Sequence, residues 1–535
     1  MNDSRIVDAV LVSLAAYLLQ RLARTARRRL VTTRLRGPPS VDIVTGVGST
    51  LLMAKDASIL YDEWATEFGP VFSVPSGLFA SKIVLCDPKA ATHVYARDTA
   101  MYHRPQAMRD GIASIAGHNL LWAEGEDHKR HRRAMIPAFS NASIRKLTPA
   151  FIDAGYKVKE AWEGIIAEST EKDSAVIDIQ TWMGRISLDS IGIAGFSHDF
   201  GSLSGAHPAV NVFFDALNEK TSSVKTIRWP LLEVVKSWPD RLSGKSKKFS
   251  MEMSNSLGEA AEPMLERVRQ EKAGEVSRED KSIIGLLVKS ESLGEGAEMH
   301  MSPEEVLSQM KLLIFAGKET TSAALTMALV RLSQNQDAQT KLRDELSKFA
   351  TSDPTYEQLT NGLPYLDAVI TESLRLMASG SISDFTRVAG EDDVIPLSHP
   401  VRDASGKLVD SIVVAKGTLV CVSISYMNRS PAIWGRDSRE FRPERWLDED
   451  GLPSKAKEIQ GHRHILTFSD GQRACLGKQF ALAELKAVLS VLIRYFVLEM
   501  EKKGGEVERA GLLSSQLKIV GEDGVGVPLR IRRVD

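Results

Sequence analysis

Cysteine is scarce in this chain of 535 residues, which has only Cys86, Cys421 and Cys475. Three cysteines cannot build a disulfide framework, nor a zinc site made of several thiolates. This count does not exclude a single cysteine that acts as a reactive or metal-ligating thiol.

The chain also lacks an excess of charge. It has 68 Lys and Arg against 69 Asp and Glu, a formal net charge of -1. That balance is not typical of a nucleic-acid-binding domain or of an acidic solvating tail. The sequence contains no glycine-rich dinucleotide fingerprint, so nothing in it assigns an NADPH or flavin site. With 43% hydrophobic and 26% charged residues, the composition is that of an ordinary globular protein.

Long hydrophobic runs are missing except for a short one near the N-terminus. Residues 9–20 are uncharged and mostly apolar, but a full membrane span needs about 20 such residues. Arginines are frequent in residues 21–36, and positive charge on that side favours a cytosolic location for the rest of the chain. Gly37-Pro38-Pro39 then forms a stiff break. We therefore expect residues 1–36 to be a membrane anchor with a basic flank, single-pass or partly inserted; an amphipathic leader is the alternative.

Helical periodicity dominates residues 88–380, and two stretches that break it, 270–281 and 292–301, are expected to be surface loops. Pro303, followed by two glutamates, is typical of a helix start, and the helix should continue to about residue 334.

Strand-like sequence is confined to a few places. Residues 71–74 and 82–85 predict a hairpin, and residues 411–424 predict a second strand-rich patch with its turn at Lys416-Gly417. The fold class predicted is mainly α with a minor β part, as one large domain over residues 37–535.

Cys475 lies in the segment Phe-Ser-Asp-Gly-Gln-Arg-Ala-Cys-Leu-Gly, residues 468–477. A thiolate that binds a large planar cofactor needs a loop without bulky side chains, and Gly471 and Gly477 meet that need. The helical run that follows places the sulfur near a helix N-terminus, which favours thiolate. Arg473 could reach an acidic substituent of the cofactor, and Phe468 could shield the sulfur.

This segment resembles the haem-binding loop Phe-x-x-Gly-x-Arg-x-Cys-x-Gly of the cytochrome P450 family, and every fixed position is met. The resemblance implies one P450-type domain around a buried haem b (iron protoporphyrin IX), with Cys475 as the axial thiolate ligand of the iron. An inert buried thiol is the alternative, and it is the preferred interpretation for Cys86 and Cys421.

The predicted long helix contains Phe-Ala-Gly-Lys-Glu-Thr-Thr at residues 315–321. It resembles the family pattern Ala/Gly-Gly-x-Asp/Glu-Thr-Thr/Ser. The resemblance implies that Ala316 and Gly317 clear a groove over the haem, that Thr320 hydrogen-bonds dioxygen, and that Glu319 relays protons through water. The alternative is a solvated glutamate beside a threonine that bonds back to a helix carbonyl.

Further segments match family positions with structural or cofactor-binding roles. Glu372 and Arg375 share a helix face, and Arg445 in Phe-Arg-Pro-Glu-Arg-Trp matches the arginine that joins them in a buried structural network. The family also has a Trp-x-x-x-Arg pair that contacts a haem propionate; here His128 replaces the tryptophan, with Arg132 in register. A solvated basic face is the alternative for that segment.

Arg387 matches another family position that pairs with a propionate, although the prolines that usually precede it are absent. Several segments look most like fungal members: Gly-Glu-Asp-His-Lys-Arg at residues 125–130, Asn-Arg-Ser at 428–430 and Ile-Trp-Gly at 433–435.

The resemblance implies a monooxygenase that inserts one atom of O2 into a C–H bond of a lipophilic molecule. NADPH–cytochrome P450 reductase, with cytochrome b5 as a further candidate, would supply electrons at the endoplasmic reticulum membrane, with the catalytic domain facing the cytosol. A docking face for the reductase could include Lys129, Arg130, Arg463 and Lys478, or these could be scattered surface charges.

By analogy, the substrate pocket should be lined by residues 101–121, 211–229, 379–386 and 513–517. A mostly apolar wall is expected from Ala378, Ser379, Ser381, Ile382 and Phe385. A fungal secondary metabolite such as a terpenoid fits it, and so does a fatty acid or a xenobiotic. Two other classes stay open: a haem-thiolate enzyme of rearrangement or peroxygenation, and a non-enzymatic haem protein. Both are disfavoured by Glu319 and Thr320.

Overall fold

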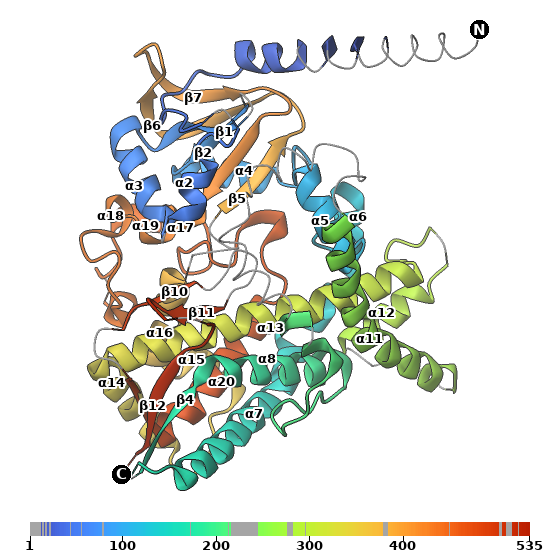
Figure 1. The fold of residues 1–535 in the computed structure, drawn as a ribbon, viewed down its shortest axis with the longest axis vertical. Helices are drawn as coiled ribbons and strands as arrows, with labels where there is room; N and C mark the ends of the chain where they lie inside the picture. The colour runs from blue at the N-terminus through green and yellow to red at the C-terminus, as the bar shows by residue number, and fades with distance from the viewer. Residues whose placement is uncertain are drawn as a thin grey trace.

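The computed structural model describes residues 12, 15–16, 19–20, 23–42, 44–54, 56–77, 80–171, 173–211, 213–215, 244–274, 282–294, 296–377, 384–448, 450–501, 505–509, 516–522 and 524–534. Helices form the larger body of the molecule, and the strands β1, β2, β5, β6 and β7 gather in a smaller layer at one end (Figure 1). The predicted fold class, mainly α with a minor β part in one P450-type domain, is confirmed.

The longest helices, α7 (Asn141–Glu168), α11 (Gly244–Gly274) and α13 (Pro303–Gln334), belong to the helical body. At the β-rich end and around it lie α2 (Gly48–Met53), α3 (Ala57–Phe68), α4 (Pro88–Ala96), α17 (Ile424–Arg429), α18 (Pro431–Trp434) and α19 (Ser454–Lys457). The rest are α5 (Gln106–Ala116), α6 (Gly125–Met135), α8 (Ile179–Phe196), α12 (Ile283–Glu291), α14 (Gln336–Leu346), α15 (Tyr356–Asn361), α16 (Pro364–Leu376) and α20 (Lys478–Tyr495).

Helix α13 is the long helix predicted from the sequence, and it crosses the body of the molecule (Figure 1). Its start is fixed by a capping box, in which the Ser302 hydroxyl accepts from the Glu305 N–H and the Glu305 carboxylate accepts from the Ser302 N–H. Nearly every residue from Thr321 to Val330 is buried, since α8, α11, α16 and α20 all pack against this helix. Groups on α13 are therefore held rigidly.

The main sheet has the strand order β1-β2-β8-β5-β3, and its strands are β1 (Val71–Gly77), β2 (Ala80–Leu85), β3 (Tyr102–His103), β5 (Asp384–Ala389) and β8 (Leu419–Ser423). The predicted hairpin is confirmed, with Val71 opposite Leu85. Smaller sheets contain β4 (Ser174–Asp178), β6 (Asp393–Arg402), β7 (Leu408–Val414), β9 (Phe496–Met500), β10 (Val507–Arg509), β11 (Leu517–Ile519) and β12 (Pro528–Arg533). The predicted patch at 411–424 is divided, because β7 pairs with β6 whereas β8 pairs with β2 and β5.

One predicted loop is partly wrong. Helix α11 continues to Gly274 and so takes in the first residues of the stretch 270–281, whose remainder lies outside the described residues. The other, 292–301, contains no helix or strand among its described residues.

Most of the predicted anchor lies outside the described residues, and within the described part of the chain no helix is both long and apolar enough to cross a membrane. The basic flank is described and is helical over residues 23–31. Arg27 forms an ion pair with Asp392 at 2.6 Å, and Arg28 donates to the Gly417 carbonyl at 2.9 Å. Part of the flank thus packs on the β-rich end of the domain.

Candidate active site

The cysteine loop is a compact turn between the core and α20. The Cys475 N–H donates to the Phe468 carbonyl at 2.8 Å, which closes the loop on itself. Gly471 has φ +67°, and a Cβ at this position would lie 2.3 Å from the carbonyl oxygen of Tyr95, at the end of α4. Only glycine combines that conformation with that approach.

The sulfur of Cys475 faces open space although its loop is packed in the protein. The side chain is exposed, whereas Cys86 and Cys421 are buried, as expected of inert thiols. Desolvation by the surrounding protein raises the pKa of the Cys475 thiol, and the Gly477 N–H and the positive charges of Arg132 and Lys478 oppose that rise. These are groups that would stabilise a bound thiolate.

Thr320 and Glu319 occupy contrasting environments on α13. Thr320 is exposed amid buried neighbours, and its hydroxyl donates to the Ala316 carbonyl at 2.7 Å. Glu319 is only 3% exposed, and its carboxylate lies 2.6 Å from the Lys318 ammonium. The ammonium also lies 3.9 Å from the ring centroid of Phe214. The threonine therefore does bond back to a helix carbonyl, but the glutamate is a buried ion-pair member and not a solvated side chain.

The packing of α13 gives a reason of its own for a glycine at position 317. A Cβ on this residue would lie 2.8 Å from Cγ1 of Ile191 on α8, so the missing side chain points toward that helix. The close packing of α13 against α8 therefore requires a residue without a side chain here, and the groove expected over a cofactor stays a prediction. Ala316 is half-buried and contributes the carbonyl that Thr320 binds.

The predicted network of Glu372, Arg375 and Arg445 is brought together in the core. Arg375 donates to the two carboxylate oxygens of Glu372 at 2.8 and 2.7 Å, and Arg445 Nε lies 3.5 Å from Glu372 Oε1. Arg375 also donates to the carbonyl of Asn428, whose amide donates to the Thr467 hydroxyl at 2.9 Å. The network therefore reaches the residue that precedes Phe468 and supports the cysteine loop.

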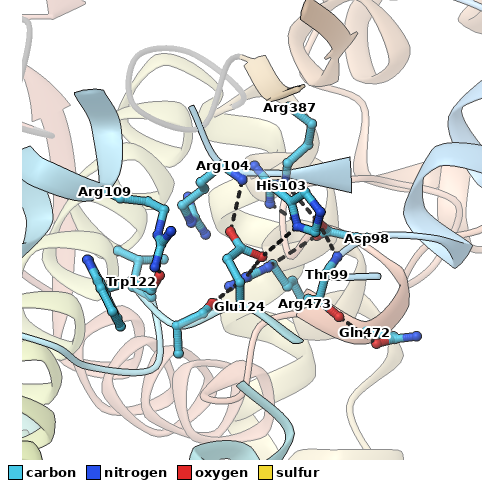
Figure 2. Close-up of polar contacts among 12 residues, drawn as sticks. Asp98, Thr99, His103, Arg104, Arg109, Trp122, Glu124, Arg387, Gln472 and Arg473 are labelled. Carbon is cyan, nitrogen blue, oxygen red and sulfur yellow. Dashed lines mark hydrogen bonds and ion pairs between the residues drawn. The ribbon is translucent and has the colours of Figure 1, made fainter. Parts of the chain in front are cut away.

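A cluster of arginines surrounds the other side of the loop. Figure 2 shows Arg473 close to both Glu124 and Asp98, with Arg387 alongside. Arg387 donates to Asp98 through Nε at 2.8 Å and Nη2 at 3.1 Å, so this edge of its guanidinium is already occupied. Arg473 Nη2 lies 2.5 Å from Glu124 Oε2. Two of the predicted propionate-binding arginines, Arg387 and Arg473, thus have carboxylate partners.

Arg104 is a member of the cluster that sequence reasoning missed. Burial, followed by the nearby charges of Arg387 and Arg473, lowers its pKa to about 9. The Nε atoms of Arg104 and Arg473 are buried and have no hydrogen-bond partner within the described structure. Burial and the cations Arg473, Arg132 and Arg104 likewise lower the pKa of His128 to about 3, so this histidine is neutral near pH 7. The cluster is an uncompensated positive site that suits anionic groups.

No motif marks Arg104, Asp98 or Glu124, because their grouping with Arg387 and Arg473 joins distant parts of the chain that only the fold brings together. Lys318 falls at the variable position of the family pattern, and so the pattern gives it no role either.

Three of the four basic residues predicted for a reductase-docking face are already engaged in ion pairs. Lys129, Arg130 and Arg463 form ion pairs with Glu126, Glu305 and Asp367 respectively. This geometry favours the interpretation as ordinary surface charges over a dedicated docking face.

The predicted substrate-pocket segments are only partly described. Phe385 is buried and packs 4.5 Å from the Tyr95 ring and 3.6 Å from Arg387, so it is a core residue and not a pocket wall. Residues 378–383 and 510–515, and most of 211–229, lie outside the described residues. In the 101–121 segment, Gly117 and His118 line a cavity of about 490 Å³ beside the start of α13.

Comparison with known proteins identifies the chain. A family model described as Cytochrome P450 matches residues 38–518. The chain belongs to the cytochrome P450 family. Similar relatives include the cytochrome P450 monooxygenases claQ and claO of Ampulloclitocybe clavipes, each 48% identical, over 99% and 97% of this chain and 98% and 96% of the relatives. Cytochrome P450 monooxygenase 128 of Postia placenta is 33% identical over 98% of this chain and 97% of that relative.

This P450 is therefore a monooxygenase, an oxidoreductase, and its family implies a haem-thiolate cofactor. The residues present fit such a group. Cys475 is exposed at the end of a loop held close by Gly471, and Thr320 is exposed on a rigid helix. Among the described residues, the buried Nε groups of Arg104 and Arg473 make no hydrogen bond, and such donors suit the propionates of a porphyrin.

Proposed function

We propose that this P450 inserts one atom of O2 into a C–H bond of a lipophilic small molecule. The observation that carries the proposal is the pair on α13, an exposed Thr320 hydroxyl beside the buried Glu319 carboxylate. Reductive splitting of dioxygen consumes two protons, and an alcohol next to an acid is a means of delivering them. Rearranging, peroxide-driven or non-catalytic haem proteins have no need of that supply.

Cys475 is proposed to ligate the iron of haem b, and Arg104, Arg132, Arg473 and His128 to bind its propionates. Neutral His128 can donate one hydrogen bond to a carboxylate, while the arginines supply charge. When bound, the haem supplies the metal centre at which dioxygen is activated.

The Thr320→Ala enzyme tests the proton-delivery role. It should consume NADPH while releasing more peroxide and less product per NADPH. Thr326→Ala is the matched control, since Thr326 also bonds back to a helix carbonyl, that of Ser322, at 2.8 Å. Unchanged product yield per NADPH in Thr320→Ala would remove the basis for the assignment.

The ligand is tested by the spectrum of the reduced, carbon-monoxide-bound protein. Wild type and Cys421→Ala should give a thiolate-type Soret band, because Cys421 is fully buried in the sheet. Cys475→Ala should lose it. A normal haem spectrum in Cys475→Ala would refute the ligand.

For location, we propose the endoplasmic reticulum membrane, with the catalytic domain facing the cytosol. Large apolar side chains are exposed at Leu30 (77%), within the basic flank, and at Val41 (65%) and Met53 (81%), in the residues that follow the flank. Apolar side chains beside arginines suit an anionic membrane surface. The full chain should remain in the microsomal fraction after washing with high salt. Release by salt would mean that the chain is attached to the membrane by charge alone.

The electron donor proposed is NADPH–cytochrome P450 reductase, with cytochrome b5 as a second donor. The substrate proposed is a fungal secondary metabolite such as a terpenoid. Reconstitution with the reductase and a panel of terpenoids, fatty acids and xenobiotics tests both together. Turnover of fatty acids or xenobiotics alone would replace the substrate proposal.

A further inference from the structure

The residues that follow α4 form a strained turn beside the cysteine loop. Thr99 has φ +71°, which a β-branched residue adopts only when its surroundings impose it. Its N–H is directed to the Asp98 carboxylate at 3.0 Å and to the Tyr102 carbonyl at 2.9 Å, and its hydroxyl donates to Gln472 in the cysteine loop at 2.9 Å (Figure 2). The turn therefore fixes the position of Asp98 relative to the loop that carries the ligand.

Asp98 joins two of the arginines of the site. Its side chain is fully buried and binds Arg387, on strand β5, through both carboxylate oxygens. Oδ2 also lies 3.5 Å from Nε of Arg473. One carboxylate thus links the sheet to the cysteine loop through two guanidinium groups.

Glu124 holds Arg473 from the opposite side. It stands at the N-cap of α6 but makes no side-chain capping bond there. Its Oε2 lies 2.5 Å from Arg473 Nη2, and its Oε1 accepts the backbone N–H of Arg104 at 2.9 Å. The carboxylate is therefore committed to the arginine cluster and not to its own helix.

The charges of the cluster do not cancel. Among its described members the cluster holds four arginines and two carboxylates, which leaves two positive charges in excess. Arg104, Arg387 and Arg473 interact with Asp98 or Glu124, whereas Arg132 lies near Arg473 and Cys475. A porphyrin with two propionates carries the charge that would neutralise them. Without Asp98 and Glu124, four guanidinium groups would repel one another in a partly buried site.

We infer that Asp98 and Glu124 are positioning residues for the porphyrin carboxylates. They act through Arg387 and Arg473, which they hold in place so that the remaining N–H groups are directed to the cofactor. This inference rests on the proposed haem site. It predicts that loss of either carboxylate weakens haem retention without removing any group that itself binds haem.

The experiment compares haem-loaded wild type, Asp98→Asn and Glu124→Gln, with Glu126→Gln as the control. Glu126 lies one residue beyond the start of α6, carries the same charge and has an 87% exposed side chain. The rate of haem transfer to excess apomyoglobin and the haem reduction potential are measured for each. Haem transfer should be about tenfold faster in Asp98→Asn and about threefold faster in Glu124→Gln, and nearly unchanged in the control.

The reduction potential should rise in both site variants, because each removes a negative charge near the iron. A third comparison tests whether Glu124 acts through Arg473. In an Arg473→Gln background, Glu124→Gln should add little to the rate of haem loss, since the two residues then act as one unit.

Haem transfer at the wild-type rate in a folded Glu124→Gln protein would overturn the role of Glu124, and slower transfer would mean that the carboxylates compete with the propionates. If Asp98→Asn does not accumulate as a folded protein, the inference is tested by Glu124→Gln alone and by Glu124→Gln combined with Arg473→Gln. A wild type without a thiolate-type band would instead refute the proposed haem site itself.

Discussion

Glu484 on α20 is a buried acid for which the structure predicts a large effect on stability. Its side chain is 0% exposed, and neither carboxylate oxygen has a hydrogen-bond partner within the described structure. Burial raises the pKa of this carboxyl well above its ordinary value of 4.5, and the nearby hydroxyls of Ser190 and Ser187, on α8, oppose the rise only in part. The folded protein therefore holds Glu484 protonated where the unfolded chain has it ionised.

The sign of the pH dependence follows from proton binding. Above the pKa of the unfolded chain, the folded state binds one proton more, so the free energy of unfolding falls as pH rises. The slope is about 1.4 kcal/mol per pH unit until the folded carboxyl itself ionises. Glutamine has nearly the same shape and no charge in either state. Between pH 5 and pH 7, Glu484→Gln should therefore gain about 2–3 kcal/mol relative to wild type.

Urea unfolding of wild type and Glu484→Gln at a series of pH values measures this difference. Glu67→Gln, which changes an exposed glutamate on α3, is the control and should track wild type at every pH. A difference between Glu484→Gln and wild type that is constant from pH 5 to pH 7 would refute the reasoning, because it would mean that Glu484 ionises equally in both states.

Lys318→Met should lower the product formed per NADPH and destabilise the fold by about 3 kcal/mol, since it removes the cation of the buried pair with Glu319; peroxide release and urea unfolding measure the two effects. Gly471→Ala should yield less haem-loaded protein, seen in the reduced carbon-monoxide spectrum, because its Cβ would lie 2.3 Å from the Tyr95 carbonyl. Arg375→Lys should destabilise the fold by about 3–5 kcal/mol, measured by unfolding, because lysine cannot reproduce the two-point bond to a fully buried carboxylate.

Each of these has a matched control. Lys311→Met changes the other lysine of α13, which is half-buried, and it should retain the product yield per NADPH. Gly406→Ala introduces a Cβ at φ +86° where no atom lies within 4 Å, so it should retain normal haem content. Arg436→Lys changes an exposed arginine and should be neutral. Equal effects in a variant and its control would contradict the corresponding prediction.

The parts of the fold that follow from local pattern were predictable. The start of α13 is visible in Ser302, Pro303 and Glu305, since a capping box is a property of four consecutive residues. The hairpin at Val71 was equally visible from its alternating sequence and turn. The end of α11 was predicted too early, because the charged composition of residues 270–274 is compatible with both a solvated helix and a loop.

The candidate site likewise has features that the sequence could predict and features that it could not. A contiguous motif marks Cys475, and Glu319 and Thr320 stand together in another, so the sequence alone located the proposed ligand and the acid–alcohol pair. The sequence could not predict that a side chain at position 317 would meet α8, because this depends on which helix packs against that face of α13.

What the sequence by itself determined is the family and the segments that carry its motifs: the cysteine loop, the acid–alcohol pair of the long helix and the Glu-x-x-Arg pair, each written within a few neighbouring residues. Only the tertiary structure decided how the arginines are balanced. Charges interact through space, so packing sets which charged residues become partners. The members of this cluster are separated along the chain by turns, helices and strands: Asp98, Arg104, Glu124 and Arg387. The burial of Glu319 against Lys318 follows from packing for the same reason.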